Sequence, residues 1–138
     1  MIKITKERSV SIDDILHLYQ AVGWTNYTHQ PQMLEQALSH SLSIYMALDG
    51  DAVVGLVRLV GDGFSSIFVQ DLIVLPSYQR QGIGSDLMKE ALGDYKDAYQ
   101  VQLVTDQTDK NLGFYRSLGF ETLSTYDCTG MIWVDRKK

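Results

Sequence analysis

The residues best suited to chemistry form a glycine-containing turn, Gln79-Arg80-Gln81-Gly82-Ile83-Gly84. An apolar run that stops at Pro76 precedes this turn, and a stretch with helical periodicity follows it. The pattern predicts a strand, a tight turn and a helix. A helix that starts behind small residues leaves its first backbone N–H groups unpaired, and these donors, with the positive end of the helix dipole, suit a phosphate. The sequence therefore predicts an anion site at the turn.

Two common phosphate-binding fingerprints do not fit this turn. A Walker loop requires Gly-Lys-Ser/Thr, which does not occur in the chain. A Rossmann turn requires a third glycine, where this chain has Leu87. Nucleotide hydrolysis is therefore disfavoured, and the alternative to a phosphate site is an ordinary glycine-rich turn between a strand and a helix.

A second motif lies further along the chain, from Asn111 to Phe120, with the pattern N-x-x-x-Y-x-x-x-G-F. Together with the glycine turn, it resembles the Gcn5-related N-acetyltransferase (GNAT) family. In that family a Q/R-x-x-G-x-G/A loop and this second element bind acetyl-coenzyme A. The two motifs in this order are more specific than either alone.

The resemblance implies a site for acetyl-CoA between two parallel strands that part at their ends, Ser66–Leu75 and Val101–Thr105. The pantetheine amides would bond to the backbone of the first strand, and the pyrophosphate would lie on the loop. Arg80 would add a charge contact, and Asn111 would bind the arm of the coenzyme. The cofactor-binding residues implied in this way are Leu72, Ile73, Val74, Gln79, Arg80, Gln81, Gly82, Ile83, Gly84, Ser85 and Asn111.

The reaction implied is direct attack of a neutral amine on the thioester in a ternary complex, for which positioning supplies much of the rate. A backbone N–H near Val74 could polarise the thioester carbonyl. Tyr115 occupies the position where the family often has a tyrosine near the sulfur. A phenol, with a pKa of about 10, can protonate the leaving thiolate. The alternative for Tyr115 is an ordinary half-buried helix tyrosine.

Asp71 is the candidate for the amine side of the reaction. It lies inside an apolar strand, where a carboxylate needs a partner or a raised pKa. It could accept the amine's proton or bind the ammonium form. The alternative is that Asp71 pairs with a loop N–H or with Arg58, although Arg58 itself is expected to face solvent. Asp106 and Asp109 are weaker candidates for the same role.

The remaining pattern predicts an α/β fold with a mixed, mostly antiparallel sheet and one βαβ crossover, in a single domain of residues 1–138. Strands are expected at residues 2–5, 43–48, 52–60, 66–75 and 101–105, with a closing hairpin of residues 120–125 and 131–134. Helices are expected between Ser11 and Gly23, from Pro31, behind the glycine turn, and between Asp109, as its cap, and Gly119. Trp24 and Tyr27, between the first two helices, either shape an acceptor pocket or staple these helices to the sheet.

The composition narrows the class of protein. The net charge of −5 and the lack of basic clusters beyond Arg136-Lys137-Lys138 disfavour nucleic-acid binding. Cys128 is the only cysteine, which excludes an internal disulfide and suggests no zinc site. The chain has no signal-peptide pattern and no apolar run long enough to span a bilayer, so a cytoplasmic protein without metal or membrane partner is expected.

The sequence thus predicts an acetyl-CoA-dependent N-acetyltransferase that acts on an unidentified primary amine of a small molecule, peptide or protein. The alternative is a non-catalytic acyl-CoA-binding sensor or interaction module, which would keep the loop but would not need Tyr115 and Asp71. A homodimer through the edge strands near the C-terminus stays open by analogy alone.

Overall fold

The computed structural model describes residues 1–6 and 11–135. The chain falls into two compact units, Met1–Val104 and Thr105–Lys138. The basic residues Arg136-Lys137-Lys138 lie outside the described residues. None of the helices in the described part is long and apolar enough to cross a membrane.

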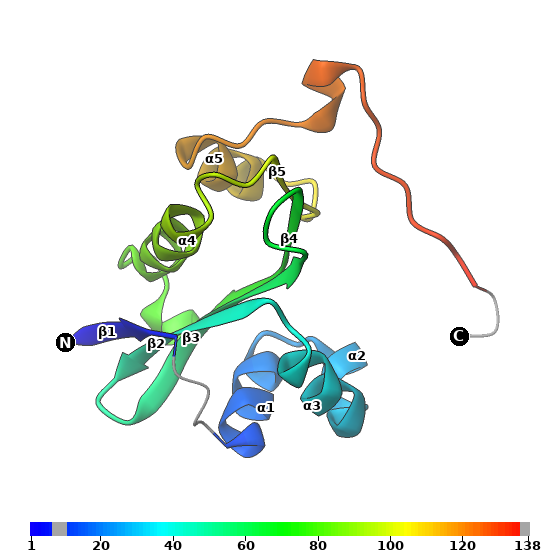
Figure 1. Cartoon of the computed structure of the whole chain (residues 1–138). Helices are drawn as coiled ribbons and strands as arrows, with labels where there is room; N and C mark the ends of the chain where they lie inside the picture. The colour runs from blue at the N-terminus through cyan, green and yellow to red at the C-terminus, as the bar shows by residue number, and fades with distance from the viewer. Residues whose placement is uncertain (7–10, 136–138) are drawn as a thin grey trace. The chain divides into compact units, whose positions relative to one another are not determined.

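The first unit contains a five-stranded sheet with the strand order β1-β2-β3-β4-β5 (Figure 1). The strands are β1 (Ile2–Thr5), β2 (Ser43–Asp49), β3 (Ala52–Gly61), β4 (Ser66–Val74) and β5 (Gln100–Leu103). Strands β1 to β4 pair antiparallel and β5 pairs parallel to β4. The predicted mixed sheet with one βαβ crossover is confirmed.

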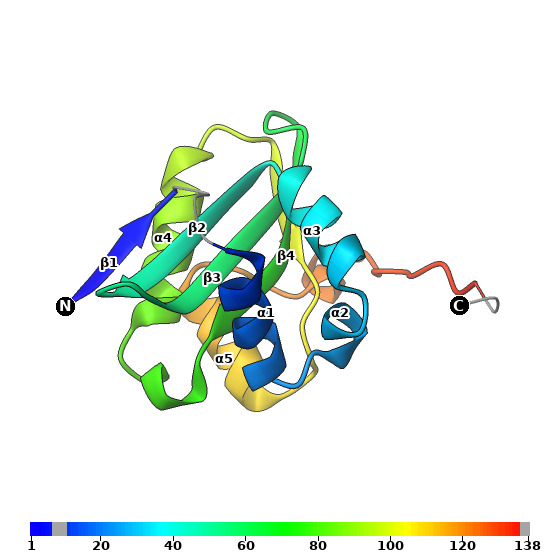
Figure 2. The same ribbon diagram turned by 90° about the horizontal axis from the view of Figure 1, so that it is seen from below.

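Helices cover both faces of this sheet. On one face lie α1 (Ile12–Ala21), α2 (Thr25–Thr28) and α3 (Pro31–Ser39), and on the other lies α4 (Ile83–Asp94) (Figures 1 and 2). As predicted, Ser11 caps α1 by accepting a hydrogen bond from the Asp14 N–H (3.3 Å), and Pro31 occupies the first turn of α3. The apolar face of α4 is buried, with Ile83, Leu87, Met88 and Ala91.

Gly55 lets α4 and the sheet approach closely. A Cβ at this position would lie 3.2 Å from Leu87 Cδ1 and 3.2 Å from the Ile73 carbonyl oxygen. The neighbouring strand also has a small residue here, because Ala47 pairs with Gly55. Small residues on β2 and β3 therefore make room for Leu87, which fixes the depth at which α4 and its preceding loop sit on the sheet.

The turn between β3 and β4 is held by one carboxylate. Asp62 Oδ1 accepts hydrogen bonds from the backbone N–H groups of Phe64, Ser65 and Ser66, at 2.7, 2.7 and 3.1 Å, and Oδ2 accepts one from the Ser65 hydroxyl. The hydroxyl and the three N–H donors lower the pKa of Asp62 well below its ordinary value. The turn is therefore well ordered although it is exposed to solvent.

The second unit contains α5 (Asp109–Ser117) and a 3₁₀ helix, η2 (Leu123–Tyr126). The N-cap of α5 is Thr108, whose hydroxyl accepts from the Asn111 N–H (3.1 Å), and the predicted cap Asp109 lies in the first turn instead. Gly119, with a φ of 97°, follows the last helical turn as predicted.

The predicted closing hairpin is wrong. Residues 120–125 form the approach to η2 and η2 itself, and residues 131–134 have no regular secondary structure. The Thr122 hydroxyl bonds to the hydroxyls of Ser124 (3.1 Å) and Thr125 (3.2 Å), and Asp127 is left-handed with a φ of 58°. Such local side-chain hydrogen bonds compete with the backbone pairing of a strand, and at these residues they stabilise a compact turn instead.

Candidate functional site

Part of β4 has an open edge. Pairing with β5 covers only Ser66–Val69 opposite Gln100–Leu103, whereas β4 continues to Val74. Beyond Val69, no strand of the described chain pairs with this edge of β4. The parallel strands thus stop being neighbours before β4 ends, which is where the family resemblance implies a site for the coenzyme.

The backbone N–H and C=O groups of every second residue of β4 point to this open edge. The Leu75 N–H donates to the Val54 carbonyl of β3 (2.9 Å). Because the backbone groups of successive strand residues point to opposite edges, those of Ile73 also face β3. Those of Leu72 and Val74 face the open edge and could pair with an amide-containing ligand. Of the three predicted strand contacts, the backbone therefore favours Leu72 and Val74 over Ile73.

The loop between β4 and α4 has two left-handed residues, Arg80 with a φ of 65° and Gly82 with a φ of 81°. Gly82 is the N-cap of α4 and provides no capping side chain. The Asp86 N–H donates to the Gly82 carbonyl (2.9 Å), and this bond begins the hydrogen-bond series of α4. Since the first N–H groups of a helix have no partner within it, those of Ile83, Gly84 and Ser85 could together serve as a cradle for an anion.

Side chains anchor this loop to the sheet. Gln79 Nε2 donates to the Val74 carbonyl at the end of β4 (3.1 Å). The Tyr78 hydroxyl donates to Asp49 Oδ2 at the β2–β3 turn (2.6 Å). Hydrogen bonds of side chains therefore hold the loop against the open end of β4. Gln79, which is predicted as a cofactor contact, has a structural role at the same place.

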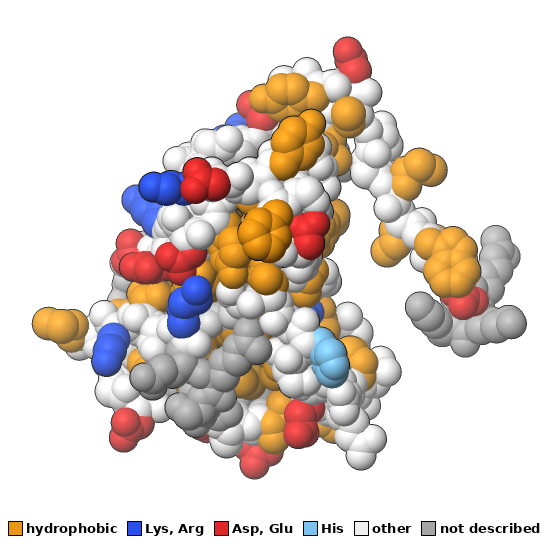
Figure 3. Space-filling view, in the orientation of Figure 1, with side chains coloured by type: hydrophobic (Ala, Val, Ile, Leu, Met, Phe, Trp, Pro, Cys, Tyr) orange, Lys and Arg blue, Asp and Glu red, His pale blue; other side chains and the backbone are white. Residues whose placement is uncertain are grey.

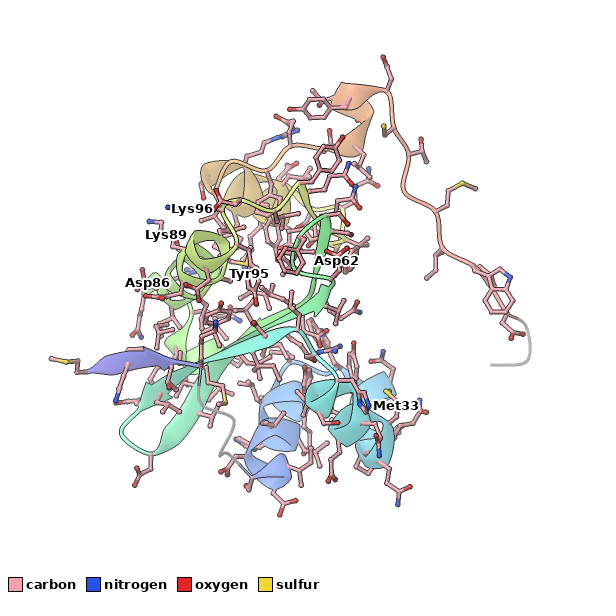
Figure 4. The ribbon with its side chains drawn as sticks, in the orientation of Figure 1. Met33, Asp62, Asp86, Lys89, Tyr95 and Lys96 are labelled. Carbon is pink, nitrogen blue, oxygen red and sulfur yellow. The ribbon has the colours of Figure 1, made fainter. Side chains whose placement is uncertain are left out.

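Further along α4, the surface is unsuited to an anion. A shallow cavity of about 440 Å³ is lined by Ile4, Asp86, Lys89, Glu90, Gly93 and Asp94. Asp86 and Lys89 project from α4 beside this cavity (Figure 4). Three carboxylates face a single ammonium group there, so a phosphate is better accommodated at the loop, where the donors are backbone N–H groups and Arg80.

On the opposite face of the sheet, Asp71 is the centre of a buried polar cluster. Asp71 is 3% exposed and Arg58 is 4% exposed. Asp71 Oδ2 accepts from Arg58 Nε (2.8 Å) and from the Tyr19 hydroxyl (2.7 Å), and Oδ1 accepts from the Tyr27 hydroxyl (3.1 Å). The predicted solvent-facing position of Arg58 is wrong, and the pairing of Asp71 with Arg58, left open by the sequence, is what the structure contains.

This cluster also orients the aromatic residues that follow α1. The Tyr27 hydroxyl accepts from Arg58 Nη2 (3.3 Å), and its ring centroid lies 4.9 Å from that of Tyr19 and 6.4 Å from that of Trp24. Burial, with a smaller contribution from Asp71, raises the pKa of Tyr19 far above its ordinary value, so Tyr19 stays a donor. Tyr27 and Trp24 thus join the short helices to the sheet, as one of the two sequence interpretations expected.

Two further candidates, Asn111 and Tyr115, lie in the second unit. Asn111 Nδ2 donates to the Thr105 hydroxyl (3.1 Å). Tyr115 is half-buried between Phe114 and Phe120, at centroid distances of 5.0 and 5.9 Å in edge-to-face geometry. Burial raises the pKa of the Tyr115 phenol. Its hydroxyl bonds to none of the described residues, so it remains able to donate a proton.

Neither Asp106 nor Asp109, the weaker base candidates, is buried. No group of three or more His, Cys, Asp or Glu side chains in the described residues could hold a metal ion. The sequence does not predict the contact of Tyr19 with Asp71, whereas Arg58 is one of the two partners that it leaves open for Asp71. The available signal was Arg58 itself, a charge within the apolar run of a central strand, next to the strand that carries Asp71.

The fold and the loop together define an α/β protein with an anion cradle at a βαβ crossover beside an open strand edge. Residues 40–122 match the family model described as "Acetyltransferase (GNAT) domain". The chain therefore belongs to the GNAT acetyltransferase family.

Known proteins agree with this assignment. The structure is similar to a GNAT family acetyltransferase from Streptococcus pneumoniae, with 76% identity, a TM-score of 0.90 and 99% of each chain covered. Its fold also matches a GNAT family acetyltransferase from Elizabethkingia anophelis solved with acetyl-CoA bound, with 22% identity, a TM-score of 0.67, and 87% of this chain and 76% of that chain covered.

Among curated relatives, the chain is 30% identical over 95 residues to serotonin N-acetyltransferase 2, chloroplastic, of Oryza sativa subsp. japonica. This match covers 66% of the present chain and 48% of the rice protein. The chain spans about half to two thirds of the length of the first curated relatives that it matches.

Proposed function

We propose that this chain is an N-acetyltransferase that moves the acetyl group of acetyl-CoA to a primary amine by direct attack in a ternary complex. The observation that carries the proposal is the cradle of first-turn N–H groups behind left-handed Gly82, linked by Gln79 to the open edge of β4. Acetyl-CoA has an anionic pyrophosphate, which suits the N–H cradle, and an arm with amide groups, which suits the open edge of β4. The acetyl-CoA bound by the Elizabethkingia protein of the same fold supports this choice.

The predicted contacts keep their roles in this proposal. Backbone N–H groups of the loop and helix start bind the pyrophosphate, Arg80 adds charge, and Leu72 and Val74 bind the pantetheine arm. Asn111 would bind the same arm from the second unit. The full proposed set is Leu72, Ile73, Val74, Gln79, Arg80, Gln81, Gly82, Ile83, Gly84, Ser85 and Asn111.

The reaction joins the amine nitrogen to the thioester carbonyl carbon, and the carbon–sulfur bond breaks. The outward N–H of Val74 polarises the carbonyl. Tyr115 gives its proton to the leaving thiolate, and its raised pKa keeps it protonated at neutral pH. The proton of the amine leaves to water or to an acceptor-side base.

For Asp71 we propose a positioning role in place of direct proton transfer. Both of its oxygens already accept hydrogen bonds, from Arg58 and Tyr19 on one and from Tyr27 on the other. Asp71 is also 3% exposed, so an amine would reach the remaining lone pair of Oδ1 only if a neighbouring side chain moved. Its effect on the acceptor would therefore pass through Tyr27, which is half-buried.

The acceptor is proposed only as a class, a primary amine of a small molecule, peptide or protein, and the setting as cytoplasmic. The rice relative's name specifies serotonin, and an arylalkylamine is a reasonable first acceptor to assay. The non-catalytic alternative gains no support from the comparisons, and a protonated Tyr115 without a hydrogen-bond partner among the described residues favours the enzyme.

The test is a calorimetric titration of the protein with acetyl-CoA, with Gly82→Asp beside it. Gly82→Asp puts a carboxylate into the cradle at a left-handed position, and we expect binding to be lost. The matched control is Gly93→Asp, which adds the same carboxylate near the other end of α4, where a Cβ meets nothing within 4 Å. If the two variants bind alike, the loop is not the phosphate site.

Turnover is measured next, as thiol release from acetyl-CoA across a panel of primary amines. Binding with turnover supports the enzyme. Binding without turnover for any amine of the panel would favour the sensor module.

A further inference from the structure

The loop that leads into α4 starts with a single turn of 3₁₀ helix, η1 (Pro76–Tyr78). The Gln79 N–H closes this turn by donating to the Pro76 carbonyl (3.3 Å). Just after the turn, Arg80 adopts the left-handed region, which costs free energy for a residue with a Cβ. Such a conformation persists only where the neighbouring structure holds it, so the residues before Arg80 need an anchor.

Tyr78 connects this turn to the sheet. Its hydroxyl donates to Asp49 Oδ2 at 2.6 Å, and both side chains are half-buried. Asp49 is the last residue of β2 and pairs with Ile2 of β1 and Ala52 of β3, so its carboxylate lies on a fixed part of the sheet. A hydrogen bond to a carboxylate is roughly twice as strong as one between neutral groups. The bond raises the pKa of Tyr78, so the phenol remains a donor at neutral pH.

The other side-chain anchor of the loop differs from this one in what it uses. Gln79 Nε2 donates to the Val74 carbonyl (3.1 Å), and both of these groups are neutral. The backbone of Val74 faces the open edge of β4, where the pantetheine arm is proposed to bind, so this anchor shares its acceptor with the coenzyme. The bond from Tyr78 to Asp49 uses no group that the coenzyme would contact and can persist in the complex.

The surface of α4 adds little attraction for an anion. Figure 3 shows Asp and Glu side chains interspersed with Lys and Arg side chains over this helix. Along the cavity on α4, the carboxylates of Asp86, Glu90 and Asp94 outnumber the ammonium group of Lys89. The affinity for a pyrophosphate therefore depends on the conformation of the loop and on Arg80, and not on the charge of the helix surface.

We propose that Tyr78 and Asp49 are positioning residues, whose hydrogen bond holds the loop in its binding conformation before acetyl-CoA arrives. This role rests on the proposed function, from which acetyl-CoA is taken as the ligand. When only a fraction of the molecules has the competent loop, the apparent dissociation constant rises in inverse proportion to that fraction. Loss of the bond should therefore weaken binding of acetyl-CoA, whereas saturating coenzyme orders the loop and leaves kcat unchanged.

A double-mutant cycle, measured by calorimetric titration with acetyl-CoA, tests the proposal. Tyr78→Phe and Asp49→Ala should each raise the dissociation constant about tenfold, the usual effect of losing a hydrogen bond to a charged group. The double variant should bind no more weakly than the weaker single variant, because both changes break the same bond. Asp49→Asn keeps an oxygen that accepts from Tyr78 and should restore most of the affinity. Asp49 Oδ1 also lies 3.9 Å from the Met1 amino group, a contact that Tyr78→Phe leaves intact.

Two control variants remove the same chemical groups elsewhere. Asp51→Ala deletes a carboxylate from the turn between β2 and β3, and Tyr99→Phe deletes a hydroxyl from a side chain that is 82% exposed. Both should bind acetyl-CoA like the wild type. With an amine that the wild type acetylates, Tyr78→Phe should raise KM for acetyl-CoA and keep kcat. Wild-type affinity in Tyr78→Phe, single effects that simply add, or a tenfold fall of kcat at saturating coenzyme would each overturn the proposal.

Hydrogen exchange of the ligand-free protein gives a test that does not depend on acetyl-CoA. In Tyr78→Phe the Gln79 amide should exchange faster, whereas the amide of buried Met88 in α4 should exchange as in the wild type. Unchanged exchange at Gln79 would contradict the positioning role alone. A chain that shows the exchange difference but does not bind acetyl-CoA would overturn the proposed function, and with it the ligand assigned to this loop.

Discussion

Asp71 accepts hydrogen bonds from side chains on three different elements, α1, α2 and β3. We predict that Asp71→Asn lowers the free energy of unfolding by about 3–5 kcal/mol, because Arg58 is left as a buried charge without its counter-ion. Urea denaturation followed by circular dichroism measures this.

Two controls isolate the cause of that loss. Asp51→Asn, in the exposed turn between β2 and β3, should change stability by less than about 0.5 kcal/mol. The double variant Arg58→Met/Asp71→Leu removes both charges and should be clearly more stable than Asp71→Asn. If it is equally unstable, the tyrosine contacts and not the ion pair account for the effect.

Tyr115 should be required for turnover but not for coenzyme binding. We predict that Tyr115→Phe lowers kcat by about 10²–10⁴-fold, the usual contribution of a general acid. The affinity for acetyl-CoA should be unchanged in calorimetry. Phe114→Leu, which removes the neighbouring ring, is the control for loss of packing alone. A Tyr115→Phe variant with wild-type kcat would eliminate the acid role.

The pH dependence follows from the direction of the Tyr115 shift. Burial raises the pKa of the phenol above its ordinary value of 10.0, so the proton is retained up to and beyond that pH. We therefore expect no loss of kcat attributable to this group below pH 10. A decline of kcat near pH 8 that disappears in Tyr115→Phe would contradict a raised pKa.

At the scale of single residues, the sequence analysis offered Arg58 as one possible partner of Asp71 but did not predict the contacts of Asp71 with Tyr19 and Tyr27. A motif is defined by local spacing, whereas Tyr19 and Arg58 reach Asp71 across 52 and 13 positions of the chain. A single charge in a strand is expected to face solvent, but helices cover both faces of β3, so Arg58 is buried.

Among the elements, the packing of α4 on β3 depends on the absence of a side chain at position 55. We predict that Gly55→Val costs about 1–3 kcal/mol, since its side chain would meet Leu87 and the Ile73 carbonyl. Thermal unfolding measures this. Gly93→Ala, at a helical position with open space around it, is the control and should be neutral or stabilising. An equal effect of both changes would indicate general sensitivity of the glycines and not close packing.

Most elements could be predicted from the sequence because their periodicity and caps are local. The limits of α1 and the start of α3 agree with the sequence pattern, and the five strands lie within two residues of their expected bounds. The absence of the closing hairpin could not be predicted. Hydrophobic alternation gives no information on the hydrogen bonds between the hydroxyls around Thr122, and these bonds stabilise a turn. A strand also needs a neighbour, which the sequence of one segment does not specify.

For the molecule as a whole, binding of acetyl-CoA should be visible as stability. A ligand that binds only the folded state at one hundred times its dissociation constant adds about 2.7 kcal/mol. We therefore predict that saturating acetyl-CoA raises Tm by several degrees in the wild-type chain and in Gly93→Asp, but not in Gly82→Asp. Differential scanning fluorimetry checks this, and an equal rise in all three proteins would place the ligand elsewhere.

The family, the sheet topology and the loop geometry all indicate an acetyltransferase. None of them identifies the acceptor. The family model covers residues 40–122, which leaves α1, α2 and α3 outside it. The acceptor-side candidates Trp24 and Tyr27 lie in that uncovered part, so the match to the family model does not bear on their roles.

The cradle at the start of α4 has a consequence for how this site tolerates variation. The donors of the cradle are backbone N–H groups. The cradle therefore depends on the backbone dihedral angles of these residues and not on the types of their side chains. In a deep mutational scan selected for activity, Gln81 should accept most residue types, whereas Gly82 should accept almost none. At Arg80, where φ is also positive, glycine and asparagine should be enriched over other uncharged residues, because both adopt the left-handed region at low cost.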